Sequence, residues 1–495
     1  MRPALAIPVE SFFLSAHGTG TLQQRIRQMV SEGILSGRFR AGEKMPSSRG
    51  LAEHLGVSRI TVTLAYTELV AADYLTARGR SGYFVSDGVP VAPEFRPAPR
   101  QPGTVDWGRV TARRYSPLPR LDRPEDWQAY PYPFIYGQAD PTLFDHQNWR
   151  LCAVQALGRK EFSSLTADHY ERDDPMLIEY ILRNILPRRG IDAHPSEVLL
   201  TMGAQNGLWL AAQVLLGQGG HAAVETPGYS GIRAVLALAG ARITAVPVDA
   251  EGLPPDRLPD AVDVVFTTAS HHCPTNATLP VERRVALLEA AEARDFLIVE
   301  DDYEFEMSFL KPVTPSLKSL DAGGRVIHVG SFSKSIFPGL RLGYIVAPEP
   351  FIREARALRS AVLRHPPGHI QRTAALFLSL GHYDALINRM KAAYRKRRQI
   401  MEEAITDCGL TVAGQGGFGG SSFWMRAPDG VDTEALAHEL RGQGVLIEPG
   451  SVFFDPAQAP RNFYRLAYSS ILPARIPEGI ARIAAAIAAT KAATV

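Results

Sequence analysis

Lys334 lies between two serines and shortly before an arginine, in the segment SFSKSIFPGLRLGY at 331–344. A nearby cation lowers the pKa of an amine, and a neutral amine can form a Schiff base with an aldehyde. The hydroxyl groups of Ser331 and Ser333 and the guanidinium of Arg341 can hold a phosphate at the same time. An aldehyde that carries a phosphate describes pyridoxal 5′-phosphate (PLP). A solvated lysine in a Ser/Gly loop is the alternative.

The chain around this lysine predicts an α/β domain. Beyond residue 131, short apolar runs bounded by glycine alternate with helical segments, which is typical of a mixed, mostly parallel sheet covered by helices. Ligands bind such sheets beyond the carboxyl ends of the strands, so we expect the chemistry in the loops that follow them. The predicted strands begin at Val198, His221, Val262, Phe296 and Val326.

Three further segments have residues suited to a cofactor or its ligand. The turn at 201–207 leads into a helix, so the backbone N–H groups of Ala204 and Gln205 would point at an anion. Tyr229 follows another predicted strand and can stack on a flat ring. Arg465, near the C-terminus, can bind a carboxylate in bidentate fashion. The alternatives are an ordinary turn and a tyrosine that only packs.

Acidic and metal-binding residue types follow two of the strands. Asp301 can pair with a protonated pyridine nitrogen, and Tyr303 can reach the phenolic oxygen of the same ring. A Mg²⁺ site is the competing use of Asp301 and Asp302, but no phosphate-binding Gly-Lys-Ser/Thr sequence accompanies them. In HHCPTN at 271–276, neighbouring side chains point to opposite sides and no second cluster completes a tetrahedral set. We therefore predict no metal site.

Composition narrows the class of protein. The chain has 495 residues, 45% hydrophobic and 21% charged, which is typical of a soluble globular protein with at least two domains. No apolar run approaches the roughly 18 residues of a membrane span, and the N-terminus is too soon acidic for a signal peptide. Three widely spaced cysteines fit a reducing cytoplasm, where we expect the protein. The net charge of +2 indicates no particular partner.

Residues 1–85 have the pattern of a DNA-binding module, with ten basic and six acidic residues. Apolar residues from 22 to 34 recur with helical period, and Ser47 and Ser58 can cap two further helices joined by a glycine-containing turn. That arrangement is the helix-turn-helix signature. Residues 74–85 then predict a hairpin with a basic tip, which is a wing.

Several polar residues of this module lie where DNA would be. Arg59, Thr61 and Thr63 are on the N-terminal part of the third helix, the part that enters a major groove. Arg49 begins the second helix, and Arg80 lies at the tip of the wing, where phosphates or the minor groove would lie. A small helical domain with solvated arginines is the alternative.

A proline-rich segment separates this module from the large domain. Residues 86–130 lose periodicity, and eight prolines fall between positions 90 and 124. Such a composition cannot bury a core and favours an extended tether. Its arginines are either solvated or in contact with the DNA backbone. The predicted domains are therefore 1–85, a linker at 86–130, and 131–495.

The first module resembles the winged helix of the GntR family. The resemblance is carried by LSGRFRAGEKMPSSRGLAEHLGVSRITVTLAYTELVAADYL and GRSGYFV, in particular by Pro-Ser-Ser-Arg, Leu-Gly-Val-Ser-Arg and Gly-x-x-Gly. It implies binding to double-stranded DNA. The DNA contacts that it implies are Arg49, Ser58, Arg59, Thr61, Thr63 and the wing residue Gly79.

The order of sites in the large domain resembles the fold-type I PLP-dependent aminotransferases, and the two domains together resemble the MocR group of transcriptional regulators. The resemblance implies that Lys334 forms the internal aldimine and that Arg465 binds the carboxylate of an incoming amino compound. It also implies a head-to-tail homodimer, in which each winged helix can lie over the other subunit. The remaining cofactor contacts that it implies are Asp301, Tyr303, Tyr229, Ala204, Gln205, Ser331, Ser333 and Arg341.

Two segments depart from the family pattern. Cys273 stands where related enzymes have the asparagine of Asn-Pro-Thr-Gly, and Asn276 stands at its closing glycine. The expected Tyr-Gly-Asp-Pro segment is replaced at 170–175 by YERDDP. Both differences argue against efficient transamination. HHCPTN and DPMLIEYILRNILPRRGI are also similar to the ectoine-utilisation regulators within the group.

These features favour a PLP-dependent transcriptional regulator that senses an amino compound when an external aldimine displaces Lys334. An active aminotransferase and a regulator that senses PLP itself are the alternatives, and a PLP-free interaction scaffold is a fourth. The sequence indicates neither the effector nor the operator.

Overall fold

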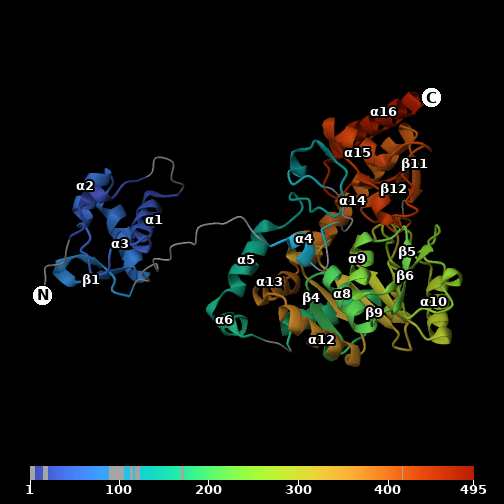
Figure 1. The fold of residues 1–495 in the computed structure, drawn as a ribbon, viewed down its shortest axis with the longest axis horizontal. Coiled ribbons are helices and arrows are strands. Elements are labelled where there is room, and N and C mark those ends of the chain that lie inside the picture. Colours follow the sequence, from blue (N-terminus) through green and yellow to red (C-terminus); the bar gives the residue numbers. More distant parts are fainter. Residues whose placement is uncertain are drawn as a thin grey trace. The chain divides into compact units, whose positions relative to one another are not determined.

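The computed structural model describes residues 6–14, 20–88, 105–111, 115–116, 123–168, 172–414 and 416–494. The chain divides into two compact units, residues 1–113 and 114–495 (Figure 1), and each is described by itself. Much of the predicted linker lies outside the described residues. So do Tyr170 and Glu171 of the segment that departs from the family pattern.

The first unit contains the predicted helix-turn-helix and wing. Ser47 Oγ accepts the N–H of Gly50 at 3.0 Å, and Ser58 Oγ accepts that of Thr61 at 3.1 Å, so each serine caps its helix as predicted. Gly56 ends the second helix in the left-handed conformation, with φ of 64°. The elements are α1 (Leu22–Leu35), α2 (Ser48–Leu55), α3 (Arg59–Ala71), β1 (Leu75–Ala77), β2 (Tyr83–Val85) and the short α4 (Trp107–Val110).

One apolar core holds α1, α2, α3 and the hairpin together. Ile26 and Val30 of α1, Leu51 of α2, and Val62 and Tyr66 of α3 are fully buried in it. They recur at helical spacing, which is why the sequence predicted all three helices. The hairpin closes the core, with Leu75 of β1 paired to Val85 of β2.

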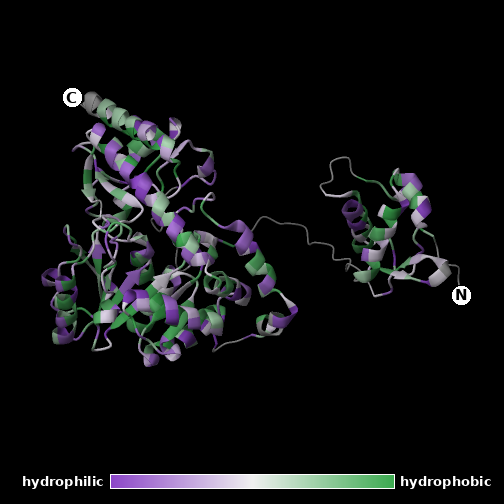
Figure 2. Cartoon of the chain, turned by 180° about the vertical axis from the view of Figure 1, so that it is seen from behind, coloured by the Kyte–Doolittle hydropathy of each residue, from purple (hydrophilic) through white to green (hydrophobic). Residues whose placement is uncertain are grey.

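The second unit is built on a seven-stranded sheet in the order β4-β10-β9-β8-β7-β5-β6, in which only β10 is antiparallel to its neighbours. This confirms the predicted mixed, mostly parallel sheet. In Figure 2, hydrophobic colour concentrates on these strands. Their bounds are β4 (Val198–Thr201), β5 (His221–Thr226), β6 (Arg242–Pro247), β7 (Val264–Thr267), β8 (Leu297–Asp302), β9 (Val326–Ser331) and β10 (Gly343–Val346).

Helices cover both faces of the sheet because successive strand residues point to opposite sides. Val224 and Val299 pack with α8, α9 and α12, whereas their neighbours Ala223 and Ile298 pack with α10 and α11. The helices of the unit are α5 (His146–Ala156), α6 (Arg159–Thr166), α7 (Pro175–Tyr180), α8 (Ala204–Leu215), α9 (Ser230–Ala239), α10 (Val281–Arg294), α11 (Leu317–Leu320), α12 (Glu349–Leu363), α13 (Gly368–Ser379), α14 (His382–Asp407), α15 (Thr433–Gly442) and α16 (Ile476–Thr494).

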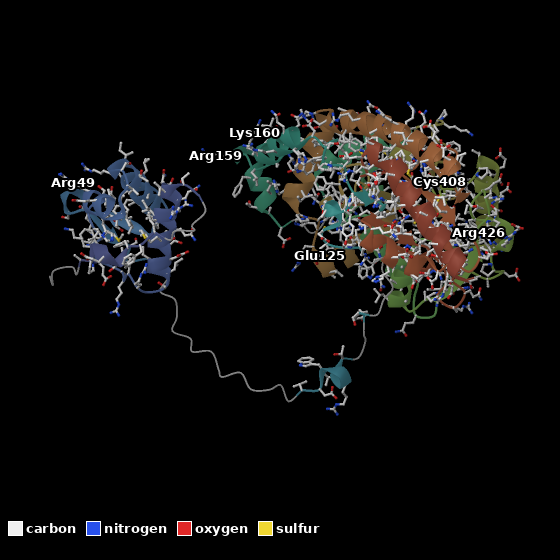
Figure 3. All side chains as sticks on the ribbon, turned by 90° about the horizontal axis from the view of Figure 1, so that it is seen from above. Arg49, Glu125, Arg159, Lys160, Cys408 and Arg426 are labelled. Atoms are coloured by element: carbon white, nitrogen blue, oxygen red, sulfur yellow. The ribbon has the colours of Figure 1, made fainter. Side chains whose placement is uncertain are left out.

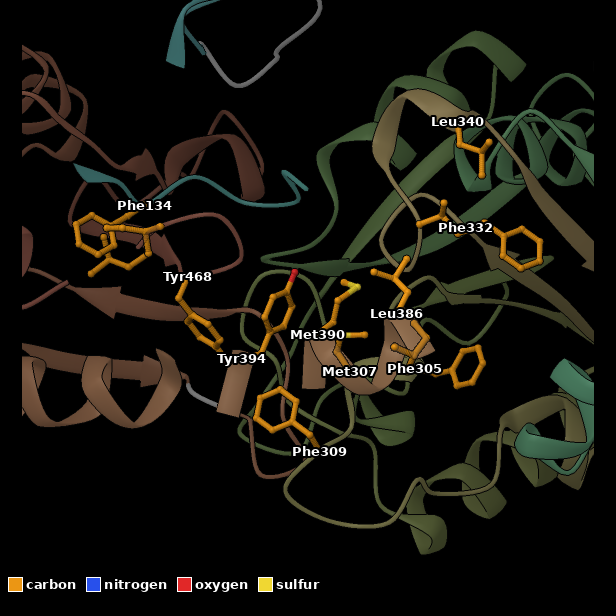
Figure 4. Packing of buried hydrophobic residues seen from close by; sticks show 14 of the residues in the cluster. Phe134, Phe305, Met307, Phe309, Phe332, Leu340, Leu386, Met390, Tyr394 and Tyr468 are labelled. Carbon is orange, nitrogen blue, oxygen red and sulfur yellow. The ribbon is translucent and has the colours of Figure 1, made fainter. Parts of the chain in front are cut away.

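The C-terminal part adds a smaller antiparallel sheet in the order β11-β12-β15-β14. The long helix α14 connects it to the rest, and Figure 4 shows part of the core that they share, including Met390 and Tyr394 of α14. The strands are β11 (Thr411–Gly414), β12 (Ser422–Arg426), β14 (Glu448–Pro449) and β15 (Phe463–Ala467), and a separate parallel pair joins β13 (Val445–Leu446) to β3 (Tyr132–Pro133).

Candidate functional site

A cavity of about 290 Å³ lies in the large unit and collects the predicted cofactor residues. Because Gly343 of β10 pairs with both Thr201 and Ser331, the loops beyond β4 and β9 lie beside the start of β10. Each predicted cofactor and effector residue lines this cavity, namely Ala204, Gln205, Tyr229, Asp301, Tyr303, Ser331, Ser333, Lys334, Arg341 and Arg465.

Lys334 reaches this cavity from the loop that follows β9. Its Nζ lies 4.3 Å from the centre of the Tyr136 ring. Burial is the main cause that lowers the pKa of the amine to about 8, against the opposing charge of Glu304. Gly137 also contacts the amine closely, because a Cβ there would overlap Nζ. The site therefore holds an amine that loses its proton far more readily than an ordinary lysine.

One end of the cavity has the groups of an anion site. Gly203 precedes α8 with φ of 78° and no side chain caps the helix, so the N–H groups of Ala204 and Gln205 lie at its uncapped start. Arg341 Nη2 donates to the carbonyl of Met202 at 3.0 Å and would lie 3.2 Å from a Cβ on Gly203. The hydroxyls of Ser331 and Ser333 line the same cavity. A phosphate fits this donor set.

Asp301 provides a buried carboxylate at the carboxyl end of β8. Its Oδ1 has no hydrogen-bond partner among the described residues. Burial, and then the charges of Asp302 and Glu225, raise the pKa of Asp301 to about 8. An unpaired carboxyl oxygen is costly in such a place. A protonated ring nitrogen would supply the missing partner.

Two tyrosines lie beside this carboxylate. Tyr303 donates its hydroxyl to the carbonyl of His271 at 3.0 Å. Tyr229 lies just before α9 and donates to Gln205 Oε1 at 2.7 Å, which fixes the orientation of its ring. Burial raises the pKa of both phenols, that of Tyr229 to about 12, so both remain proton donors.

Arg465 lies on β15 and is already paired. Its Nε donates to Glu448 Oε2 at 2.8 Å, and its Nη1 lies 3.7 Å from the sulfur of Cys273. Burial opposes the charge of the guanidinium, but Glu448 outweighs it and raises the pKa of Arg465. Burial raises the pKa of the Cys273 thiol to about 11, so the thiol stays protonated.

The sequence did not predict several residues around this cavity. Arg123, Tyr136 and Phe453 line it, and Glu448 bridges two of its arginines. None belongs to a motif, and Glu448 and Arg123 are 325 positions apart in the sequence. The only local signal is that Glu448 directly follows the apolar run at 445–447. That signal does not identify a partner.

Most of the predicted DNA contacts lie on α2 and α3, and Ser58 caps α3. Arg49 and Arg59 are exposed, and Figure 3 shows Arg49 at the surface of its unit. Ser58 and Thr61 share a hydrogen bond of 2.7 Å between hydroxyls, and Thr63 Oγ1 donates to the carbonyl of Arg59 at 2.9 Å. The arginines are therefore free to turn toward a duplex, whereas these hydroxyls are oriented by the helix.

Two features of α3 and the wing were not predicted. Ile60 of α3 is 72% exposed, and an exposed apolar side chain in this position can contact a thymine methyl group. On the wing, Arg78 lies 3.4 Å from Asp87 in an exposed ion pair. Gly79 has φ of 46°, which suits a tight wing tip. The side chain of Arg80 lies outside the described part of the chain.

Known families match both units. Residues 22–85 match the bacterial regulatory proteins of the gntR family, and residues 156–483 match aminotransferase class I and II. The large unit is thus an aminotransferase-like domain of fold type I. Its backbone resembles LysN, an alpha-aminoadipate aminotransferase from Thermus thermophilus complexed with N-(5′-phosphopyridoxyl)-L-leucine. The TM-score is 0.67 with 27% identity, covering 74% of this chain and 95% of that one.

Two curated regulators match nearly the whole chain. The chain is 72% identical over 483 residues to the HTH-type transcriptional regulator TauR of Rhodobacter capsulatus, covering 98% of this chain and 100% of that protein. It is 30% identical over 469 residues to the "Probable rhizopine catabolism regulatory protein MocR" of Rhizobium meliloti, covering 93% and 92%. The chain therefore belongs to the MocR-type transcriptional regulators, which confirms the predicted family. The similarity to ectoine-utilisation regulators stays a prediction.

Neither a membrane span nor a metal cluster occurs in the described parts of the chain. No helix there is long and apolar enough to cross a membrane. No three His, Cys, Asp or Glu side chains gather there as a metal-binding group. His272, the middle residue of the His-His-Cys triplet, instead pairs its Nδ1 with Thr275 at 2.7 Å.

Proposed function

We propose that this regulator binds PLP in the cavity and senses an amino compound through Lys334. The observation that carries the proposal is that one cavity holds a lysine with a pKa of about 8, an unpaired buried carboxyl oxygen and an anion site. The same chain carries a GntR-family winged helix. When bound, PLP supplies an aldehyde carbon that bonds to amines and a ring that withdraws electrons.

Each side chain has a defined task in this proposal. Lys334 offers a neutral amine to the aldehyde carbon. The N–H groups of Ala204 and Gln205, with Ser331, Ser333 and Arg341, hold the phosphate. Asp301 would accept a hydrogen bond from the protonated ring nitrogen, and the positive charge of that nitrogen would keep the carboxylate ionised. Tyr303 would turn its hydroxyl from the carbonyl of His271 to the ring oxygen, and the Tyr229 ring would lie against the cofactor.

The amino compound acts by taking the place of Lys334. Arg465 would bind its carboxylate, and Lys334 would then no longer join the loop after β9 to the cofactor. A ligand shifts a protein between two states only as far as it binds one of them better. The amino compound would therefore change DNA affinity by favouring one arrangement of a head-to-tail homodimer. Arg49, Ser58, Arg59, Thr61, Thr63, Gly79 and Arg80 would contact the duplex.

An absorbance titration of the purified protein tests this proposal. We expect a visible band that is lost on borohydride reduction and that shifts, without further reaction, when the right amino compound is added. The same compound must change the affinity for operator DNA selected from a random pool. A protein that shows no band even with excess PLP contradicts the proposal.

An active aminotransferase is the second candidate, because the catalytic lysine, ring carboxylate and carboxylate-binding arginine all line one cavity. Cys273 argues against it, since a protonated thiol donates a weaker hydrogen bond than an amide. Steady keto-acid production at about 1 s⁻¹ or faster would favour the enzyme. A change in DNA affinity with PLP alone would instead favour a sensor of PLP.

A further inference from the structure

A chain of three charged groups lies at the cavity wall and joins three separate segments. Glu448 Oε1 accepts Arg123 Nη2 at 3.1 Å, and Glu448 Oε2 accepts Arg465 Nε at 2.8 Å. Arg123 Nη2 also donates to the carbonyl of Tyr136 at 3.0 Å. One buried carboxylate thus holds two guanidinium groups that both line the cavity.

The two arginines are held in different ways. Glu448 and Arg465 face each other in the register of β14 and β15, and both side chains are 4% exposed. Each of these two charges therefore already has an opposite charge beside it. The Arg123 side chain is 30% exposed and comes from a segment that the sequence assigns to the linker. Its Nε is buried and has no hydrogen-bond partner among the described residues.

The charges do not balance. Two guanidinium groups against one carboxylate leave one positive charge on this wall, and Arg123 still has an unused donor. A buried N–H donor without an acceptor is costly, so this wall favours a ligand that brings an acceptor such as a carboxylate. A guanidinium also binds a carboxylate more specifically than a lone ammonium does.

We propose that Arg123 is a recognition residue for the carboxylate of the effector, and that Glu448 is the carboxylate with which the effector competes. This inference rests on the proposed function and names the class of ligand: an amino compound whose amine meets Lys334 and whose acid group meets Arg465 and Arg123. The Tyr136 ring contacts both ends, 4.3 Å from Lys334 Nζ and 4.1 Å from Arg465 Cζ.

Recognition by Arg123 also explains how the cavity can affect the DNA-binding unit. Arg123 is tied to Glu448 and to the carbonyl of Tyr136 in the absence of an acid group. An entering carboxylate that draws Arg123 away from Glu448 changes how the end of the predicted linker is held. Ligand binding and the position of the linker then depend on the same side chain, Arg123, so a change in one affects the other.

Calorimetry on the full-length protein with PLP tests this assignment. The probes are the straight-chain amino carboxylates from glycine to 5-aminopentanoate, each beside the amine of the same length without the acid group. The quantity of interest is the affinity ratio of each acid to its matched amine. Arg123→Gln and Glu448→Gln are compared with Arg183→Gln, a control whose side chain is 76% exposed and paired only at the surface.

The two variants should change this ratio in opposite directions. We expect Arg123→Gln to lower the ratio roughly tenfold to hundredfold, the loss of a charged hydrogen bond. Glu448→Gln should raise it, because the competing charge is gone, and Arg183→Gln should leave it as in the wild type. An ion pair that only stabilises the fold predicts that both cavity variants lower the ratio or leave it unchanged.

Three results would overturn the inference: a wild-type ratio near one for every probe, an unchanged ratio in Arg123→Gln, or a lower ratio in Glu448→Gln. Failure of the proposed function has a different signature. In that case the visible band is absent or does not respond to any amine, whatever ratios calorimetry gives.

Discussion

The surface of the winged helix and the cavity of the large unit hold their polar groups in opposite ways. Arg49 and Arg59 are exposed, and the hydroxyl of the exposed Ser58 caps α3. In the cavity, Asp301 is buried and Lys334 is half-buried, and the loss of water around them moves both pKa values to about 8. The exposed arginines would gain favourable interactions only when DNA binds. The polar groups of the cavity instead raise the free energy of the folded protein until a ligand provides the missing hydrogen-bond partners.

This difference has a consequence for mutation. Removing an exposed DNA contact should affect binding and leave stability nearly unchanged, since surface substitutions seldom exceed about 0.5 kcal/mol. Removing a buried polar group that lacks a partner should weaken ligand binding and stabilise the ligand-free fold. That combination is a trade-off between stability and function.

Replacing Lys334 with alanine should have the largest effect. Without the amine nothing in the cavity can bond to the aldehyde carbon, so the visible band should be absent at any PLP concentration used for the wild type. Absorbance after gel filtration measures it. Lys160→Ala, at an exposed position shown in Figure 3, is the matched control and should keep the band. A wild-type band in Lys334→Ala would show that another group holds the cofactor.

The sequence predicted this lysine and most of its neighbours for a physical reason. In an open α/β sheet the loops beyond the carboxyl ends of the strands meet. Residues at those ends of β4, β5, β8 and β9 could therefore be predicted to share one site. Tyr136, Glu448 and Arg123 escaped because they reach the cavity from segments without strand periodicity. Their partners depend on how the C-terminal sheet packs, and no local spacing encodes that.

In the winged helix, by comparison, local signals were enough to predict nearly all of the helices and turns. Caps, periodic apolar residues and glycine turns are local signals. The helix α1 begins at the first of the periodic apolar residues, and α2 and α3 begin directly after the predicted caps. The exposed Ile60 was missed because an isolated surface hydrophobe is ordinary in any sequence. Only its place on the outward face of α3 gives it meaning.

Arg59→Gln should have the next largest effect. Loss of one base or phosphate contact should weaken specific DNA binding by about 1–3 kcal/mol. The melting temperature should not change, because the side chain is exposed. Fluorescence anisotropy at two salt concentrations and thermal denaturation measure the two quantities. A large fall in melting temperature would contradict the contrast between the two regions.

Asp301→Asn should stabilise the PLP-free protein while abolishing tight PLP binding. The folded pKa of Asp301 is about 8 against an ordinary value of 3.8, so the folded state holds a proton that the unfolded chain has lost between these values. Stability therefore falls as pH rises from about 4 to 8. At pH 8 we expect the variant to be more stable by about 1–3 kcal/mol.

Urea unfolding of the PLP-free protein at pH 5 and pH 8 measures this effect. The advantage of Asp301→Asn over the wild type should grow with pH. Asp263→Asn would be an unsuitable control, because Asp263 accepts the N–H of His221 at 2.7 Å. The exposed Asp429 is better, and Asp429→Asn should show no such trend. A pH-independent difference in Asp301→Asn would contradict the assigned pKa.

The smallest expected effect is a difference in DNA affinity between variants of two similar helix caps, Ser47 and Ser58. Ser47→Ala and Ser58→Ala each remove one N-cap hydrogen bond, worth about 1 kcal/mol. Both should lower the stability of the first unit by a similar amount. Only Ser58→Ala should also weaken DNA binding beyond that loss, since Ser58 orients Thr61 at the start of α3. Equal DNA affinities in the two variants would contradict a role for Ser58 in the DNA interface.

The most direct test of the central claim is the affinity of the PLP-bound protein for its operator, with and without the amino compound that shifts its spectrum. We predict that the compound changes this affinity in the wild type and has no effect in Lys334→Ala. The same change in both proteins would mean that the cavity lysine does not transmit the signal.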